Sequence, residues 1–202
     1  MKALFSAAYF PPIAWIAAAQ RYDTLLIEAK ETYPKQTYRN RTEIMTAGGV
    51  RALTVPVVRN NHSRTEEVLI DYRDRWNIIH MRTLTAAYSA SPYFQYYSDD
   101  IEQLLNTRYT TLLELDVATI KWLLKQYKIR CDIELTSDWT ASAGEMHDLR
   151  DTFTPKRPYP TDNFKPYYQV FGDRIPFTPN LSALDLLMNL GPEAKDYIEE
   201  IV

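Results

Sequence analysis

The residues best suited to chemistry lie in one nine-residue stretch, Tyr33-Pro34-Lys35-Gln36-Thr37-Tyr38-Arg39-Asn40-Arg41. This stretch combines three cations with two tyrosines, a glutamine and an asparagine. Lys35, Arg39 and Arg41 could bind a phosphate or carboxylate, because cationic side chains, guanidinium groups above all, donate hydrogen bonds to such anions. In an extended strand, Arg39 and Arg41 would point to the same side. The alternative interpretation is a solvated, charged strand of a hairpin.

Residues elsewhere in the chain complete the candidate site. Ser6 and Tyr9 follow the first predicted strand and would form the wall opposite the nine-residue stretch, in which Tyr38 and Asn40 would orient the ligand. His80 is the candidate proton carrier, because histidine titrates near neutral pH. It lies on a mostly apolar helical face, so a hydrogen-bonded structural role is the alternative interpretation.

The first thirty residues have the pattern of a βαβ unit. An apolar run at 2–9 predicts a buried strand, Pro11-Pro12 ends it, a helix extends to Gln20, and residues 25–29 predict a second strand. Strand, helix and strand within this length imply parallel pairing. The turn after the first strand would then face the loop after the second, which brings Ser6 and Tyr9 close to the nine-residue stretch.

Further strands follow the nine-residue stretch. Residues 38–45 alternate and predict a hairpin strand, with a turn at Ala47-Gly48-Gly49 and a return strand at 51–58. Residues 67–72 and 129–135 predict two more strands. The fold class is therefore α/β, with a mixed sheet of about five to six strands.

The rest of the chain is predicted to be mainly helical. Apolar residues recur at helical spacing at 75–90, with Asp74 as the N-cap, and Thr111 with Glu114 forms a capping box before a helix that could start as late as Asp116. A helix also follows Ser182. We predict one domain over 1–202, with a sheet-rich part at 1–72, a mainly helical part at 73–202 and an irregular arm at 137–168.

Composition excludes several classes of function. A net charge of −3 argues against broad nonspecific binding of nucleic acid, and the single Cys131 excludes an internal disulfide. Three scattered histidines indicate no metal site, and no cofactor-binding motif is present. The apolar N-terminal segment is interrupted by two prolines, so we expect a cytoplasmic protein without a membrane span. Formation of a homo-oligomer is left open.

Several segments resemble the WbqC-like family of bacterial proteins, which is associated with polysaccharide biosynthesis. The segments that carry this resemblance are 6–12, 33–41, 53–57, 76–80, 87–88 with 92–94, and 179–193. Many family members begin with a His-Gln-Pro segment, and this chain has Ser6-Ala7-Ala8 in its place. The resemblance implies a role in assembling a surface glycan or lipopolysaccharide, without specifying a reaction.

Two hypotheses of different classes follow. In the first, the protein is an enzyme, such as a transferase, that acts on an anionic or nucleotide-activated sugar precursor in polysaccharide biosynthesis. A specific version, comparison with nucleotidylyltransferases, is weakened by the lack of an HxGH-like motif. In the second, the protein is a non-catalytic component that binds a glycan precursor or a partner enzyme. A pocket where polar groups converge would favour the enzyme, and tyrosines spread over an open face would favour the binding component.

Overall fold

The computed structural model describes residues 1–60 and 62–201 of the chain. Its strands are β1 (Lys2–Ser6), β2 (Thr24–Glu28), β3 (Arg41–Thr46), β4 (Gly49–Thr54), β5 (Val57–Val58), β6 (Leu69–Ile70), β7 (Asp132–Leu135) and β8 (His147–Asp148). Its α-helices are α1 (Ile13–Ala19), α2 (Trp76–Tyr88), α3 (Phe94–Asn106), α4 (Leu112–Gln126), α5 (Ala183–Leu190) and α6 (Ala194–Glu200). This arrangement confirms the α/β class.

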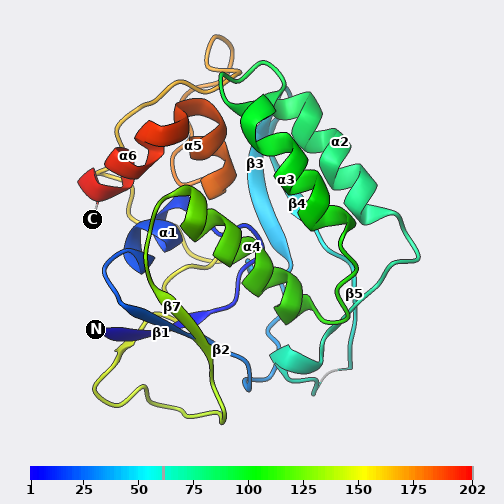
Figure 1. Ribbon diagram of the computed structural model, residues 1–202, viewed down its shortest axis with the longest axis vertical. Helices are drawn as coiled ribbons and strands as arrows, with labels where there is room; N and C mark the ends of the chain where they lie inside the picture. Colours follow the sequence, from blue (N-terminus) through cyan, green and yellow to red (C-terminus); the bar gives the residue numbers. More distant parts are fainter. Residues whose placement is uncertain (61, 202) are drawn as a thin grey trace.

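A parallel sheet with the strand order β7-β2-β1-β8 organises the fold (Figure 1). β1 pairs in parallel with β2, with Ser6 opposite Glu28, and α1 lies in the connection between these two strands. The predicted βαβ unit is thus confirmed. β7 and β8 also pair in parallel, on the outer sides of β2 and β1. All four strands therefore end at the same edge of the sheet.

The remaining strands form two separate antiparallel pairs, β3 with β4 and β5 with β6. The strands are thus divided among three sheets instead of being joined in one. Pro56, which has no N–H to donate to a ladder, lies where the chain leaves β4 and enters β5. β3 begins at Arg41, because residues 38–40 form a turn. The prediction that a strand starts at Tyr38 was wrong, and Arg39 and Arg41 do not alternate along one strand.

The helix starts show one failed and one confirmed capping prediction. α2 follows Arg75, whose side chain makes no capping bond, so the expectation that Asp74 caps this helix was wrong. α4 follows a complete capping box, in which Thr111 Oγ1 accepts from the N–H of Glu114 at 3.2 Å and the Glu114 carboxylate accepts from the N–H of Thr111 at 3.0 Å. α4 therefore begins at Leu112. Among the described residues, no helix combines the length and the apolar character that crossing a membrane requires.

The core surrounds α1, which is buried along nearly its whole length and contacts α5 and α6 (Figure 1). Aromatic rings fill the space between α1 and the sheet. The ring of Phe5 lies 4.8 Å from that of Trp15 and 5.9 Å from that of Tyr22. Most of the segment between β7 and α5 is irregular, and β8 within it was not predicted.

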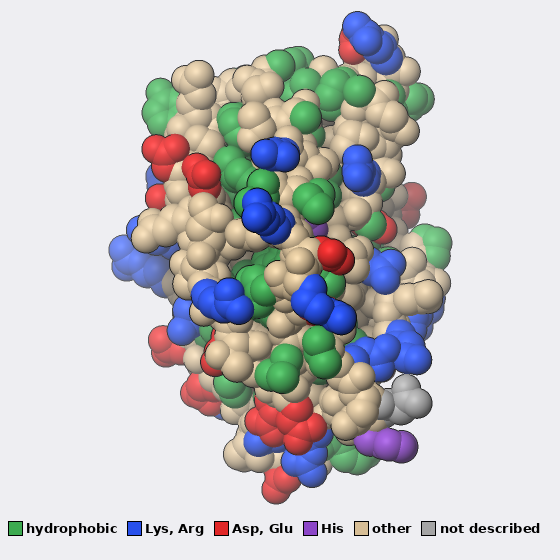
Figure 2. Space-filling model, turned by 90° about the vertical axis from the view of Figure 1, so that its right-hand side faces the viewer, with side chains coloured by type: hydrophobic (Ala, Val, Ile, Leu, Met, Phe, Trp, Pro, Cys, Tyr) green, Lys and Arg blue, Asp and Glu red, His purple; other side chains and the backbone are tan. Residues whose placement is uncertain are grey.

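Lysine and arginine side chains are spread over the face that carries α2 and β5 (Figure 2). Two arginines of the chain stack on tyrosine rings. Arg59 lies 5.4 Å from the ring centre of Tyr33, and Arg108 lies 4.7 Å from that of Tyr72. Such contacts hold a guanidinium in place while leaving its edge able to donate hydrogen bonds.

Candidate functional site

The carboxyl ends of the parallel strands gather polar side chains at one edge of the sheet. Ser6 ends β1, Glu28 ends β2 and Asp148 ends β8. The chain leaves β1 towards β2 on one side, whereas β8 later pairs on the other side of β1. Ligands of open α/β sheets bind outside the carboxyl ends of strands at such a switch in direction. The fold therefore indicates this edge as a ligand site.

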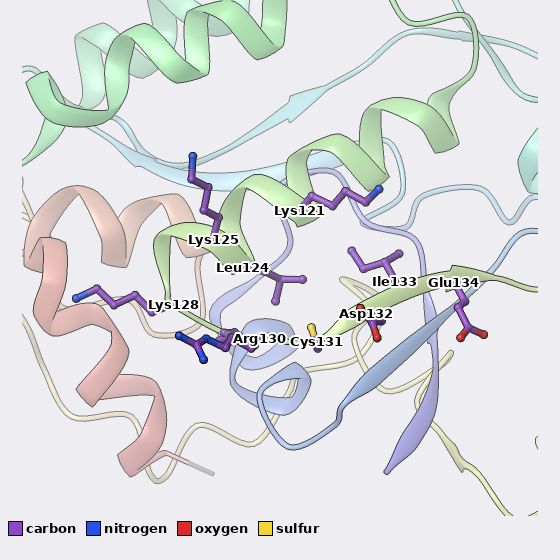
Figure 3. Close-up of a pocket in the computed structure, with 10 residues that line it drawn as sticks. Lys121, Leu124, Lys125, Lys128, Arg130, Cys131, Asp132, Ile133 and Glu134 are labelled. Atoms are coloured by element: carbon purple, nitrogen blue, oxygen red, sulfur yellow. The ribbon is translucent and has the colours of Figure 1, made fainter.

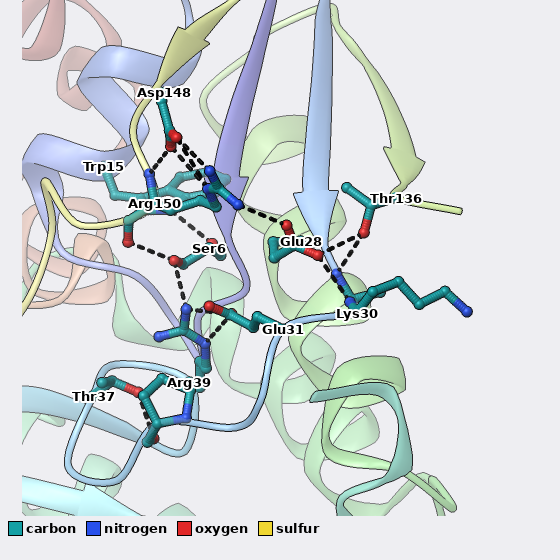
Figure 4. Close-up of polar contacts among 12 residues, drawn as sticks. Ser6, Trp15, Glu28, Lys30, Glu31, Thr37, Arg39, Thr136, Asp148 and Arg150 are labelled. Atoms are coloured by element: carbon teal, nitrogen blue, oxygen red, sulfur yellow. Dashed lines mark hydrogen bonds and ion pairs between the residues drawn. The ribbon is translucent and has the colours of Figure 1, made fainter. Parts of the chain in front are cut away.

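A network of buried and partly buried hydrogen bonds joins these strand ends (Figure 4). Ser6 Oγ accepts from Nη2 of Arg39 at 2.6 Å and donates to the carbonyl of Arg150 at 2.5 Å. Arg39 Nε donates to Glu31 Oε1 at 2.9 Å. Arg150 Nη1 donates to Glu28 Oε2 at 3.1 Å. The predicted proximity of Ser6 to the nine-residue stretch is therefore present, and Arg39 makes the contact.

A cleft of about 630 Å³ opens over this network. Its lining includes Lys30, Glu31, Arg64, Trp139, Asp148 and Arg150. The lining combines both signs of charge with one indole ring. A pocket of this size with a few fixed polar groups can hold a ligand as large as a sugar phosphate.

Glu31 is a carboxyl group of the cleft whose pKa is raised, whereas hydrogen bonding to Arg150 lowers the pKa of Asp148 in the same cleft. Burial raises the pKa of Glu31, and the neighbouring Arg39 guanidinium opposes this shift. Its side chain is 17% exposed, so it is both desolvated and reachable from the cleft. A carboxyl group with a raised pKa in a cleft has the properties of a general acid or base.

The predicted ligand-binding residues do not converge on one point. Arg39 is buried, and its guanidinium already donates to Glu31 and Ser6. Lys35 is exposed and forms no ion pair with another described residue. Arg41 is half-buried, and its Nε atom makes no hydrogen bond within the described chain. Of these three cations, Lys35 and Arg41 keep hydrogen-bonding capacity for a ligand.

Tyr38 and Asn40 make contacts within the hairpin region. The Tyr38 hydroxyl donates to Glu43 at 3.3 Å, and burial raises the pKa of this hydroxyl. Asn40 Nδ2 donates to the carbonyl of Val55 at 3.1 Å. Tyr38 also receives, on its backbone carbonyl, the N–H of Tyr9 at 2.8 Å. These bonds hold the turn before β3 against the end of β1.

His80 lies inside the fold, with Tyr9 as its partner. The Tyr9 hydroxyl is 2.9 Å from His80 Nδ1, and the ring of Trp76 lies 5.1 Å from that of His80. Burial lowers the pKa of His80 to about 4, although hydrogen bonding to the backbone of Thr54 opposes this shift. The imidazole is therefore neutral near pH 7. This arrangement is the one expected for a hydrogen-bonded structural histidine.

A second polar centre lies deeper in the interior. Asp116 on α4 is fully buried, and neither of its carboxylate oxygens hydrogen-bonds to a described residue. Burial raises the pKa of Asp116 well above its usual value, and Arg39 opposes this shift. The Tyr33 hydroxyl and Nε1 of Trp76 are likewise buried without a partner among the described residues. Such groups cost stability, so their presence needs a reason.

Another cleft, of about 790 Å³, lies between α4 and the edge strand β7 (Figure 3). Its cations include Lys121, Lys125 and Arg130, whose side chains point in different directions. They do not converge on a common ligand. Cys131 lines the same cleft, and burial raises the pKa of its thiol to about 11, so the thiol stays protonated and unreactive.

Several functional candidates were missed by sequence reasoning. Glu28 and Glu31 could have been found, because Glu28 ends an apolar strand, Glu31 follows three residues later, and the carboxyl end of such a strand marks the edge where ligands bind. Arg150 and Trp139 lie in the irregular arm, where no periodic pattern places them. Asp116 looked like a residue of the first helical turn, and only the packing of α4 shows its burial. No group of three or more potential metal-binding side chains occurs in the described part of the chain.

A sequence model of the WbqC-like protein family matches residues 7–154. The chain belongs to this family. The matched span includes Glu31, Arg39, Trp139 and Arg150, and thus most of the network and cleft at the sheet edge. The family membership confirms the resemblance seen in the sequence segments.

One relative shows that similarity extends over nearly the whole chain. The uncharacterized protein Rv1507c of Mycobacterium tuberculosis (strain ATCC 25618 / H37Rv) is 27% identical over 220 residues, which covers 94% of this chain and 91% of the relative. No solved structure matches this chain significantly. The comparisons therefore place the chain in the WbqC-like protein family.

Proposed function

We propose that the protein is an enzyme acting on an anionic sugar precursor, either a sugar phosphate or a nucleotide-activated sugar, in the biosynthesis of a surface polysaccharide. The observation that carries this proposal is the cleft over the carboxyl ends of the strands, where Glu31 is both desolvated and reachable. The association of the WbqC-like family with polysaccharide biosynthesis supplies the biological context.

Cations of the cleft would bind the anionic group of the precursor. Arg64 is exposed and makes no ion pair within residues 1–60 and 62–201. Lys30 beside it is balanced by Glu66, at 2.8 Å. A free guanidinium suits a phosphate, because it can donate two parallel hydrogen bonds. Lys35 and Arg41 remain the alternative anion site, on the stretch that the sequence indicated.

Glu31 would carry the proton of the reaction. Burial raises the pKa of this carboxyl group, which favours its protonated form, and Arg39 fixes the position of one of its oxygens at 2.9 Å. In this proposal Arg39 is a positioning residue. His80, the proton carrier considered from the sequence, does not line the cleft.

Ligand-induced stabilisation tests the binding step. We expect glucose 1-phosphate or UDP-glucose to raise the melting temperature, because a ligand that binds the folded state stabilises it by mass action. The shift should disappear in Arg64→Ala and persist in Arg82→Ala, an exposed arginine on α2 outside the cleft. If the ligand-induced shift is lost in Arg41→Ala but retained in Arg64→Ala, the anion binds at the stretch predicted from the sequence and not at Arg64. No shift with either ligand would contradict the proposal.

Glu31→Gln separates an enzyme from a binding component. We expect this variant to keep the ligand-induced shift and to lose the release of UDP from UDP-glucose, measured over hours at neutral pH with a mixed sugar-acceptor panel. If the wild-type protein binds UDP-glucose but releases no UDP with any acceptor, the non-catalytic precursor-binding function is favoured.

A further inference from the structure

Trp139 differs from the other tryptophans of the chain in its exposure. Its side chain is 54% exposed, whereas the other three, Trp15, Trp76 and Trp122, are at most 9% exposed. Trp139 also lines the cleft at the sheet edge. Contact between a large apolar indole and water is unfavourable. An indole on the wall of a polar cleft offers a surface on which a ligand ring can stack.

The irregular arm that carries Trp139 is fixed to the sheet edge next to this residue. Arg150 Nη1 donates to the carbonyl of Thr140 at 2.8 Å and to Glu28 Oε2 at 3.1 Å. The same guanidinium binds Asp148 through Nε, at 3.0 Å. Glu28 is fully buried and also accepts from the hydroxyl of Thr136, at 2.8 Å. The backbone beside Trp139 is thus held by a buried ion pair, so the indole is part of a built wall.

The remaining lining of the cleft matches the periphery of a sugar ring. Glu31, Asp148 and Asp151 offer carboxylate oxygens that accept from hydroxyl groups, and Lys30 and Arg64 offer donors. A pyranose has an apolar face of C–H groups and a rim of hydroxyl groups. One aromatic wall with several charged hydrogen-bonding groups around it therefore suits this shape better than it suits an apolar ligand.

We propose that Trp139 is the stacking platform for the sugar ring of the ligand, held in place through the Arg150–Thr140 hydrogen bond. This inference rests on the proposed function, and it assigns the sugar part of the precursor to the irregular arm. The phosphate would then lie towards Arg64 and Lys30, on the other elements of the cleft.

Quenching of tryptophan fluorescence by acrylamide reports on this residue selectively, since the other three indoles are buried. We expect saturating glucose 1-phosphate to reduce the quenching constant at least twofold. UMP and inorganic phosphate, which lack a hexose, should leave it unchanged. Protection by UMP with none by glucose 1-phosphate would overturn the proposal and indicate stacking of a base.

Substitutions separate stacking from folding. Trp139→Ala should weaken glucose 1-phosphate binding tenfold or more, while Trp139→Tyr should keep it within about threefold. Tyr168→Ala, which removes another exposed aromatic side chain outside the cleft, should have no effect. If glucose 1-phosphate stabilises the wild-type protein and Trp139→Ala equally, the stacking role is excluded and the proposed function stands. Absence of stabilisation of the wild-type protein by both glucose 1-phosphate and UDP-glucose would exclude both.

Discussion

The hydroxyl of Tyr9 lies 2.9 Å from Nδ1 of His80, and both side chains are buried. This hydrogen bond connects the bend after β1 to α2. It forms with a neutral imidazole, because burial lowers the pKa of His80 to about 4. The position of His80 therefore makes the stability of the protein depend on pH.

We expect His80 to reduce stability in acid. Its pKa is about 6.5 in the unfolded chain and about 4 in the folded protein, so between these values the unfolded state binds more protons. The stabilisation that the neutral His80 side chain gives the folded protein is complete above pH 6.5 and is lost as the pH falls through 4. The free energy of unfolding should fall by on the order of 3 kcal/mol in total. Urea unfolding of the wild-type protein and of the His80→Asn variant, repeated from pH 7 to pH 4, measures this loss of unfolding free energy. The stability difference between the two should shrink towards pH 4, and parallel curves would contradict the assignment.

Two buried aspartates should respond in opposite ways to the same substitution. Asp185 accepts hydrogen bonds from Tyr88, Tyr167 and Gln169, at 2.8, 2.6 and 3.0 Å. Asp116 accepts none from the described residues. Asp185→Leu should cost about 3 kcal/mol or more, because it leaves the buried hydroxyls of Tyr88 and Tyr167 without their acceptor. Asp116→Leu should stabilise the protein by about 1 to 3 kcal/mol, because it removes a desolvated carboxyl group.

Thermal unfolding of the two leucine variants at pH 7 tests this contrast. A stabilisation of about 1 kcal/mol raises the melting temperature by roughly 2–4 °C for a chain of this size. If Asp116→Leu lowers the melting temperature as strongly as Asp185→Leu, the carboxyl group of Asp116 has a stabilising partner inside the protein.

Gly191 and Gly49 allow the cost of a steric contact to be separated from backbone strain. Both have positive φ values, of 55° and 97°. A Cβ atom on Gly191 would lie 2.5 Å from the ring of Tyr93, whereas one on Gly49 would meet nothing within 4 Å. We expect Gly49→Ala to cost about 1 kcal/mol, and Gly191→Ala to cost at least about 2 kcal/mol more. Chemical unfolding of both variants measures the difference, and equal costs would show that the Tyr93 ring moves aside freely.

The capping box at the start of α4 makes a smaller prediction. Thr111→Ala removes the side-chain oxygen that accepts from the N–H of Glu114, so we expect a loss of about 1 kcal/mol. Thr111→Ser keeps this oxygen and serves as the matched control. A serine variant as unstable as the alanine variant would show that the methyl group of Thr111, and not its hydroxyl, stabilises the helix start.

Local patterns in the sequence predicted the elements that form over short distances. The βαβ unit was predictable from an apolar run, a proline pair and a second apolar run within thirty residues. The α4 capping box was predictable because its two residues are neighbours in the chain. Asp74 was misjudged because a good capping residue is not used when the chain enters the helix one residue later, at Arg75.

The candidate site was predicted only in part. The sequence brought Ser6 close to Arg39 through the topology of the βαβ unit, and this contact is present at 2.6 Å. The sequence did not show that the Arg39 guanidinium would form an ion pair with Glu31, because ion-pair partners depend on how the loops fold back. Arg150 reaches Glu28 across 122 positions of the chain. No local pattern contains a contact of that kind.

The pairing of β8 with β1 has a consequence for solubility. β8 joins the sheet through only two residue pairs, Ala3 with His147 and Leu4 with Asp148, followed by the bond from the N–H of Leu149 to the carbonyl of Leu4 at 2.8 Å. An uncovered strand edge is a template for pairing with another molecule. The arm therefore shields β1 from intermolecular strand exchange. Proteolytic removal of the arm should uncover the edge of β1, and the protein should then aggregate by strand pairing between molecules.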